Sequence, residues 1–288
     1  VFAVRGRTRG RPFTLEIDDP TGDLRFDLLE FVRTQLAIAL DENVIDKRAA
    51  VEIFAELAGR CSSLPVALDP VENPEAAIET FAGLLEPAET ELFRGLLAST
   101  SKRQDRLLES FVRELSDLVA VRKVGRVVVA SAYTETIEMV SELMIGKWGA
   151  HRSALHSLRQ SRSENASAVE RWETDSTCSI LFVDSGAEEG INLQAADLLV
   201  HLDLPWSTNR IEQRIGRCDR YDGDRKDAIP SVVAAYGEFA YGAAWFEFQA
   251  DAAGVFDRSV SSLQYTLATI EERLTLDVIE AGPETLRT

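Results

Sequence analysis

The sequence of 288 residues is poor in several features, and each shortage excludes a class of protein. Its three cysteines, Cys61, Cys178 and Cys218, lie far apart and form no C-x-x-C pair, so they indicate neither a disulfide framework nor a cysteine metal site. No apolar run approaches the roughly eighteen residues of a membrane span, and no signal-peptide pattern is present. We therefore expect a protein of a reducing, cytoplasmic setting with no membrane partner.

Histidine and serine motifs for catalysis are also missing. His151 and His156 are five residues apart with no third ligand nearby, and His201 lies in an apolar run, so we predict structural roles and no metal site. Ser131 and Ser185 lie outside any G-x-S-x-G pattern, which leaves a hydrolase triad unsupported.

Positive charge is scarce, and the formal net charge is −17. Residues 12–120 hold 22 Asp and Glu against 10 Lys and Arg, or −12 of that total. Such a chain attracts nucleic acid only through local basic surface. The basic stretch "VRGRTRGRPF" (4–13) belongs to residues 1–23, which we interpret as an arm or linker; a solvated end is the simpler reading and an arm that touches phosphate the alternative.

Residues 24–121 show helical periodicity throughout, which predicts an all-helical region that inserts into or bridges the molecule. The five periodic stretches span 23–40, 46–60, 73–85, 86–97 and 101–119. The stretch "LAIALDEN" (36–43) resembles a strand with an acidic pair, but its neighbours keep the helical period, so we predict an acidic helix end.

The period changes after residue 121. The apolar runs 126–133, 178–184, 197–204 and 228–236 have the length of buried strands, and helical patterns lie between them, with Thr134 as a candidate cap. Such alternation predicts an α/β fold, a parallel sheet flanked by helices, over 122–236. Residues 237–288 return to helical patterns and form a predicted C-terminal extension.

The stretch "TNRIEQRIGRCDRYDG" (208–223) places four arginines on one side of a predicted helix. Arg210, Arg214, Arg217 and Arg220 fall within roughly a third of the helical circle, together with Gln213. Ile211, Ile215 and Cys218 fall on another side and are expected in the core. Trp206, at the helix entry, is more simply a packing anchor than a platform for a stacked base.

Two loops should meet at one edge of the predicted sheet. The arginine helix follows the strand at 197–204, and "SGAEEGINLQAAD" (185–197) follows the strand at 178–184, with Gly186 and Gly190 freeing the backbone for close approach to a ligand. In open parallel sheets, ligands bind outside the carboxyl ends of the strands.

Residues 180–223 together resemble the second RecA-like lobe of superfamily 2 helicases, and more narrowly the Swi/Snf-like branch and its bacterial RapA-type relatives. "SGAEEGINLQAAD" resembles motif V, "QRIGRCDR" (213–220) motif VI and "RVVVASAY" motif IV. "DLPWSTNRIEQRIGR" is similar to the signature D-x-x-W-N-P…Q…GR…R, in which Ser207 and Thr208 replace the usual Asn-Pro. The resemblance covers roughly residues 100–250 and implies a RecA-like fold.

The resemblance implies a site for ATP between two lobes. Arg217 and Arg220 match the arginines that reach the transferring phosphate. The paired N–H groups of a guanidinium match the oxygens of such a phosphate. The resemblance further places Gln213, Arg214, Glu189 and Gly190 near the nucleotide, and it places Ser185, Gly186 and Asn192 near the nucleic acid. As an alternative, Arg210 or Arg214 pairs with Glu212, Asp219 or a carboxylate of motif V.

No G-x-x-x-x-G-K-[ST] loop occurs in the chain, so the family's first lobe, which holds most of the ATP and Mg²⁺ contacts, is expected upstream. The first residue is Val1, which also suggests a piece of a longer protein. We expect DNA, duplex rather than RNA, as a partner in the bacterial cytoplasm or nucleoid, and a protein partner for the acidic helices. The alternative is a non-catalytic RecA-like lobe that serves as an interaction or regulatory module.

Overall fold

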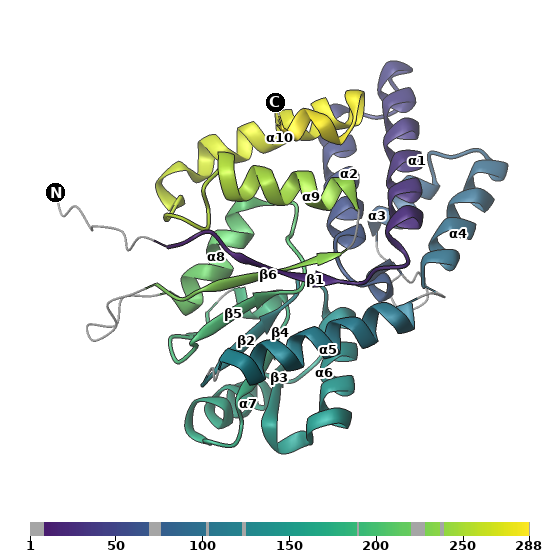
Figure 1. Cartoon of the computed structure of the whole chain (residues 1–288). Coiled ribbons are helices and arrows are strands. Elements are labelled where there is room, and N and C mark those ends of the chain that lie inside the picture. Colours follow the sequence, from purple (N-terminus) through teal and green to yellow (C-terminus); the bar gives the residue numbers. More distant parts are fainter. Residues whose placement is uncertain are drawn as a thin grey trace.

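The computed structural model describes residues 9–68, 76–101, 104–122, 125–188, 190–219, 228–236 and 239–287. Within these residues, six strands form one parallel sheet in the order β1-β6-β5-β2-β4-β3 (Figure 1). They are β1 (Phe13–Ile17), β2 (Val127–Ala130), β3 (Ser153–His156), β4 (Ile180–Val183), β5 (Leu198–His201) and β6 (Ser231–Tyr236). Every residue of β2, β4 and β5 is buried, as continuous apolar strands covered on both faces require.

Helices cover both faces of the sheet. Val127 and Val129 of β2 pack in one core with α5 (Gln104–Arg122) and α6 (Thr134–Trp148). Val128 and Ala130 belong to the other core, with α7 (Arg162–Thr174), α8 (Thr208–Cys218) and α9 (Ala240–Glu247). The alternation of neighbouring side chains across a strand therefore divides the core into two layers. This arrangement confirms the predicted parallel sheet flanked by helices.

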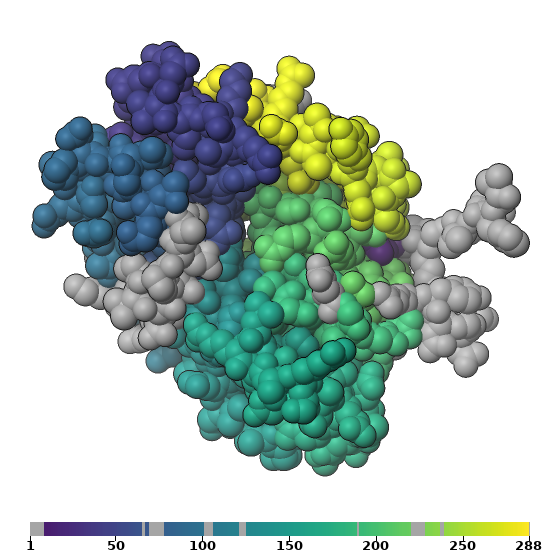
Figure 2. All heavy atoms as spheres, turned by 180° about the vertical axis from the view of Figure 1, so that it is seen from behind, coloured from purple at the N-terminus to yellow at the C-terminus, as the bar shows by residue number. Residues whose placement is uncertain are grey.

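The N-terminal helices and the C-terminal helix extend the second core. They are α1 (Gly22–Asp41), α2 (Lys47–Cys61), α3 (Ala76–Ala82), α4 (Pro87–Ser101) and α10 (Gln264–Ala281). Helix α10 packs against α1, α2 and α8, and Figure 2 shows the N-terminal helices (dark blue) beside the C-terminal segment (yellow). The Nη1 atom of Arg33 donates to the carbonyl of Ile279 at 3.0 Å, which joins α1 to α10. The helical region is thus part of one continuous core with the sheet.

Short helical turns complete the described chain: η1 (Pro65–Leu68), η2 (Ala150–Arg152), η3 (Ser185–Glu188), the π-helical η4 (Phe248–Ala252), η5 (Ser261–Leu263) and η6 (Pro283–Arg287). The described part of residues 24–121 contains no strand, which confirms its predicted helical character. The stretch 36–43 is the end of α1, with Leu36 and Ala39 buried, so the prediction of an acidic helix end is confirmed.

Three details differ from the sequence-based expectations. Residues of the predicted arm form β1, the edge strand beside β6, because the pattern "FTLEI" buries Leu15 and Ile17 on one face. The short strand β3 escaped prediction, since "SALH" lacks β-branched residues. Thr134 is the first residue of α6 and not its cap; its Oγ1 donates to Asp184 Oδ2 at 2.8 Å.

Candidate functional site

Helix α8 begins at the carboxyl end of β5, and its first turn is held by the C-terminal helix. The backbone N–H of Thr208 donates to Glu271 Oε1 of α10 at 2.7 Å. Burial raises the pKa of Glu271 above its usual value, although the hydrogen bonds from Thr208 act in the opposite direction. A carboxylate at a helix N-terminus satisfies orphan N–H groups and interacts favourably with the helix dipole. The first N–H group of α8 is therefore already bonded to the side chain of Glu271.

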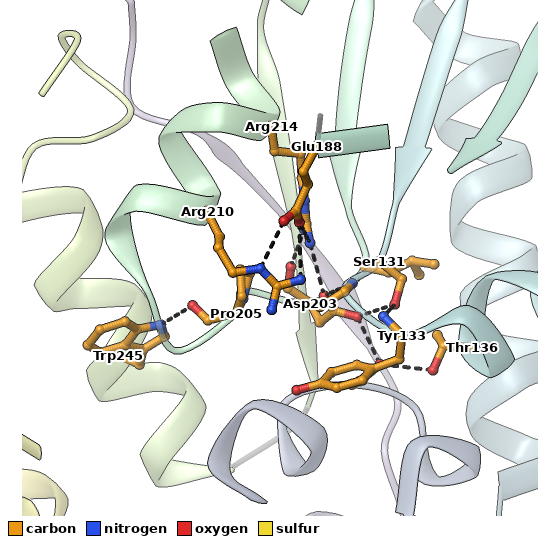
Figure 3. A network of polar contacts seen from close by, with 12 residues as sticks. Ser131, Tyr133, Thr136, Glu188, Asp203, Pro205, Arg210, Arg214 and Trp245 are labelled. Carbon is orange, nitrogen blue, oxygen red and sulfur yellow. Dashed lines mark hydrogen bonds and ion pairs between the residues drawn. The ribbon is translucent and has the colours of Figure 1, made fainter. Parts of the chain in front are cut away.

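Glu188, at the end of η3, bridges two arginines of α8 (Figure 3). Its Oε2 lies 2.8 Å from Nε of Arg210, and its Oε1 lies 3.2 Å from Nη2 of Arg214. Arg214 is 4% exposed and also donates from Nη1 to the carbonyl oxygen of Asp203 at 2.9 Å. Of the alternative partners expected for Arg210 or Arg214, the structure shows a motif V carboxylate, and Glu188 pairs with both arginines.

Arg217 contacts the same loop through the backbone. Its Nε donates to the carbonyl oxygen of Glu188 at 2.9 Å, and its own carbonyl accepts from the N–H of Leu193 at 3.0 Å. The side chain is partly exposed, as is that of Gln213 on the same helix. The structure thus brings Arg214 and Arg217 against motif V, while Glu189 and Arg220 lie outside the described residues.

Asp203, after β5, gathers hydroxyl groups from two other elements. Its Oδ2 accepts hydrogen bonds from the hydroxyls of Ser63 and Ser131, and its Oδ1 accepts from the N–H of Ala132 at 2.8 Å. Ser63 Oγ also lies 3.0 Å from Thr136 Oγ1 at the start of α6. Since Arg214 Nη2 is 3.6 Å from Asp203 Oδ1, the network connects the end of α2 to α8 (Figure 3).

A second aspartate, Asp184 after β4, shapes the start of the motif V loop. Its Oδ1 accepts from the N–H of Gly186 at 3.0 Å and its Oδ2 from the N–H of Leu158 at 2.6 Å. A Cβ atom at Gly186 would lie 2.8 Å from Cδ2 of Leu158, so a side chain there would collide with its neighbours. A side chain at position 186 would therefore have to displace the exposed side chain of Leu158.

A groove runs between this loop and α7. It has a volume of about 640 Å³ and contains three of the predicted site residues, Gly186, Gly190 and Asn192, together with Arg162 and Asn165 from α7. Gly190 has φ of +81°, a left-handed conformation that favours glycine. The groove therefore holds Gly186 and Asn192, predicted near the nucleic acid, together with Gly190, predicted near the nucleotide, and Ser185 directly precedes Gly186.

Other side chains singled out in the sequence lie in the core. Trp206 is 7% exposed and stacks on Trp245 with ring centroids 4.3 Å apart, which confirms its packing role. Cys218 is buried in the core as predicted. His201 is buried in β5, and neither ring nitrogen has a hydrogen-bond partner among the described residues.

Sequence reasoning missed Asp184, Asp203 and Ser63. The two aspartates carried a usable signal, since each lies at the carboxyl end of a predicted buried run, where parallel sheets place their ligand-binding groups. Ser63 carried none. In the described part of the chain no three His, Cys, Asp or Glu side chains are placed to hold a metal ion. No described helix combines the length and apolar character needed to cross a membrane.

Comparison with protein families and curated proteins gives consistent matches. Residues 109–222 match the helicase conserved C-terminal domain. The chain is 44% identical over 57 residues to the "Uncharacterized ATP-dependent helicase YqhH" of Bacillus subtilis (strain 168), covering 20% of this chain and 10% of that protein. It is 26% identical over 119 residues to the "RNA polymerase-associated protein RapA" of Vibrio campbellii, covering 41% of this chain and 12% of that protein. The matches thus span about a tenth of these relatives.

Solved structures share the fold. The C-terminal part of the Fun30 ATPase domain superposes with a TM-score of 0.54 at 11% identity, covering 95% of this chain and 99% of that one. A Sulfolobus solfataricus SWI2/SNF2 ATPase core in complex with double-stranded DNA superposes with a TM-score of 0.53 at 11% identity, covering 96% of this chain and 50% of that one. At such identities the likeness shows the fold alone.

Proposed function

We propose that this chain, which matches the helicase conserved C-terminal domain at residues 109–222, is the C-terminal lobe of a Swi/Snf-like superfamily 2 helicase and supplies half of an ATP site in a nucleic-acid translocase. The other half is a first RecA-like lobe that precedes it in the same parent protein. The length of the relatives supports this, because the matched segments are only 10% and 12% of those proteins.

The position of Arg217 carries the proposal. It lies in the last turn of α8, where its Nε donates to the carbonyl oxygen of Glu188 in the loop after β4. This bond orients the guanidinium, and the two terminal nitrogens are the atoms that would face a phosphate. A guanidinium fork suits the oxygens of a transferring phosphoryl group, on which charge is spread.

The remaining residues have distinct proposed roles around the nucleotide. Arg220 acts with Arg217 on the γ-phosphate, a role that rests on the sequence resemblance. Gln213, Glu189 and Gly190 border the nucleotide. Arg214, which is buried and bonded to Glu188 and Asp203, contributes by holding motif V against α8. The Mg²⁺ ion that accompanies ATP is held by the first lobe, a role that rests on the sequence resemblance.

Nucleic acid would bind along the groove between motif V and α7. Ser185, Gly186 and Asn192 lie at or beside it, and backbone N–H groups of such a loop can contact phosphate oxygens without reading sequence. We propose duplex DNA as the partner, which agrees with the complex described in the name of the Sulfolobus neighbour. The acidic helices between residues 24 and 121 would face a protein partner, because their charge repels phosphate.

The test is an Arg217→Ala substitution in the full-length parent protein. DNA-stimulated ATP hydrolysis should fall about a thousandfold, while ATP affinity, set mainly by the first lobe, should change little. Arg48→Ala is the matched control, since Arg48 is 85% exposed and pairs with Glu52 on the surface of α2. Near-normal hydrolysis in Arg217→Ala would overturn the proposal and favour a non-catalytic lobe.

A further inference from the structure

Arg9 lies just ahead of the edge strand β1 and reaches the back of α8. Its Nη1 is 2.8 Å from Glu212 Oε2, and its Nε is 3.0 Å from Asp219 Oδ2. Nη1 also donates to the carbonyl of Val255 at 3.2 Å, and the backbone N–H of Arg9 donates to the carbonyl of Asp257 at 2.9 Å. Arg9 is 8% exposed, so this is a buried site and not a solvated arm.

The two carboxylates lie on the side of α8 opposite the arginines. Glu212 and Asp219 are seven residues apart, nearly two full turns, so they project from the same face of the helix. Arg217 projects from the opposite face toward motif V. One guanidinium therefore spans the rear of α8 from its middle to its C-cap residue, a task that suits the rigid arginine fork.

Buried ion pairs add little net stability, because removing charges from water costs about as much as their attraction returns. Glu212 also accepts a hydrogen bond from Ser259 Oγ at 2.6 Å. The ion pairs of Arg9 with the two carboxylates therefore orient α8 more than they stabilise the fold. Helix α8 is held from both sides: by Glu188 at the front and by Arg9 at the rear.

We propose that Arg9 is a positioning residue that ties the segment entering this lobe to the arginine helix, so that displacement of that segment moves Arg217. The inference rests on the proposed function, in which the first lobe precedes this one and has to close against Arg217. Figure 1 shows this segment (purple) beginning beside α8 and continuing into β1. The connection between the lobes would thus act directly on the helix that carries the phosphate-binding arginines.

The first experiment compares Arg9→Ala with Arg11→Ala in the full-length parent. Arg11 is two residues away, 61% exposed, and pairs with Asp251 at 3.1 Å on the surface, so it is a matched control. In Arg9→Ala, kcat for DNA-stimulated ATP hydrolysis should fall about tenfold with KM for ATP within about twofold, because small displacements of a reacting group lower the rate more than the binding. Arg11→Ala should retain wild-type values, and equal behaviour of the two variants would overturn the proposal.

A second variant separates positioning from folding. Combining Arg9→Ala with Glu212→Gln and Asp219→Asn removes the link without leaving a buried charge unpaired, so the thermal unfolding midpoint should return toward wild type while kcat stays low. Recovery of kcat together with stability would show a merely structural role and overturn the inference. If Arg9→Ala does not fold, the triple variant alone decides, since wild-type kcat in it contradicts the proposal.

Measuring Arg217→Ala in the same assay distinguishes a failure of the Arg9 inference from a failure of the proposed function. An inactive Arg217→Ala with a fully active Arg9→Ala would overturn this inference and leave the proposed function intact. An active Arg217→Ala would overturn both.

Discussion

The Glu188 carboxylate lies 2.8 Å from Arg210 and 3.2 Å from Arg214, so one side chain of motif V neutralises two arginines one turn apart on α8. Like charges at this spacing repel each other in an isolated helix. The arginines can therefore share one face of α8 before any nucleotide binds, because Glu188, in the loop after β4, supplies part of the opposite charge.

Removing Glu188 should destabilise the protein. Among the described residues, Glu188→Ala leaves the buried Arg214 with its contacts to Asp203, and breaking a buried pair from one side typically costs about 3 kcal/mol in the free energy of unfolding. Urea unfolding of the chain measures this change. Glu52→Ala, which breaks the exposed pair with Arg48, should change the free energy by less than about 0.5 kcal/mol. Equal effects of both substitutions would show that the Glu188 bridge has no special role.

The hydroxyl of Ser63 should stabilise the junction between α2 and the sheet. Ser63→Ala removes the donor that lies 2.8 Å from Asp203 Oδ2, and the loss of a hydrogen bond to a buried charge costs about 2 kcal/mol. Ser99→Ala is the control, since the exposed Ser99 hydroxyl donates to the Gly95 carbonyl of its own helix, and it should change the free energy of unfolding by less than about 0.5 kcal/mol. A Ser63→Ala variant as stable as wild type would contradict the role of the network.

Two glycine substitutions should have opposite signs. At Gly190 the backbone φ is +81°, so Gly190→Ala should destabilise by about 1 kcal/mol through backbone strain. At Gly95, inside α4, a Cβ meets nothing within 4 Å, so Gly95→Ala should stabilise by about 0.5 kcal/mol or more. Thermal unfolding of both variants under the same conditions checks the pair, and a stabilising Gly190→Ala would refute the left-handed assignment.

Stability should fall in mild acid because of His201. Burial, with a further contribution from the positive charge of Arg214, lowers the pKa of His201 well below its usual 6.5. As pH falls below about 6.5 the unfolded chain takes up this proton before the folded one does, so the group lowers stability there and contributes nothing at higher pH.

The measurement is urea unfolding between pH 7.5 and pH 5. The free energy of unfolding of the wild type should fall by up to about 1.4 kcal/mol per pH unit more steeply than that of His201→Leu below pH 6.5. Parallel curves for wild type and His201→Leu would contradict the prediction.

Much of the fold could be predicted from local patterns. The apolar runs around Val128, Leu181 and Leu199 predicted the central strands, and helical spacing predicted α1 and α8, because these periodicities reflect burial of one face or of both. The edge strands β1 and β3 escaped, because "FTLEI" lies in a stretch that begins with basic residues and "SALH" lacks β-branched residues. Their assignment depends on pairing with β6 and β4, which no local window contains.

For the candidate site, the sequence by itself determined that Arg210, Arg214 and Arg217 share one helix face and that a glycine-containing loop reaches the same sheet edge. The tertiary structure decided which charges meet: Glu188 with Arg210 and Arg214, Ser63 with Asp203, and Arg9 with Glu212 across 203 residues of sequence. Helical periodicity is a local property that follows from a turn of 3.6 residues. The choice of partner for a buried charge depends instead on which distant segments pack together, and that is settled only when the whole core forms.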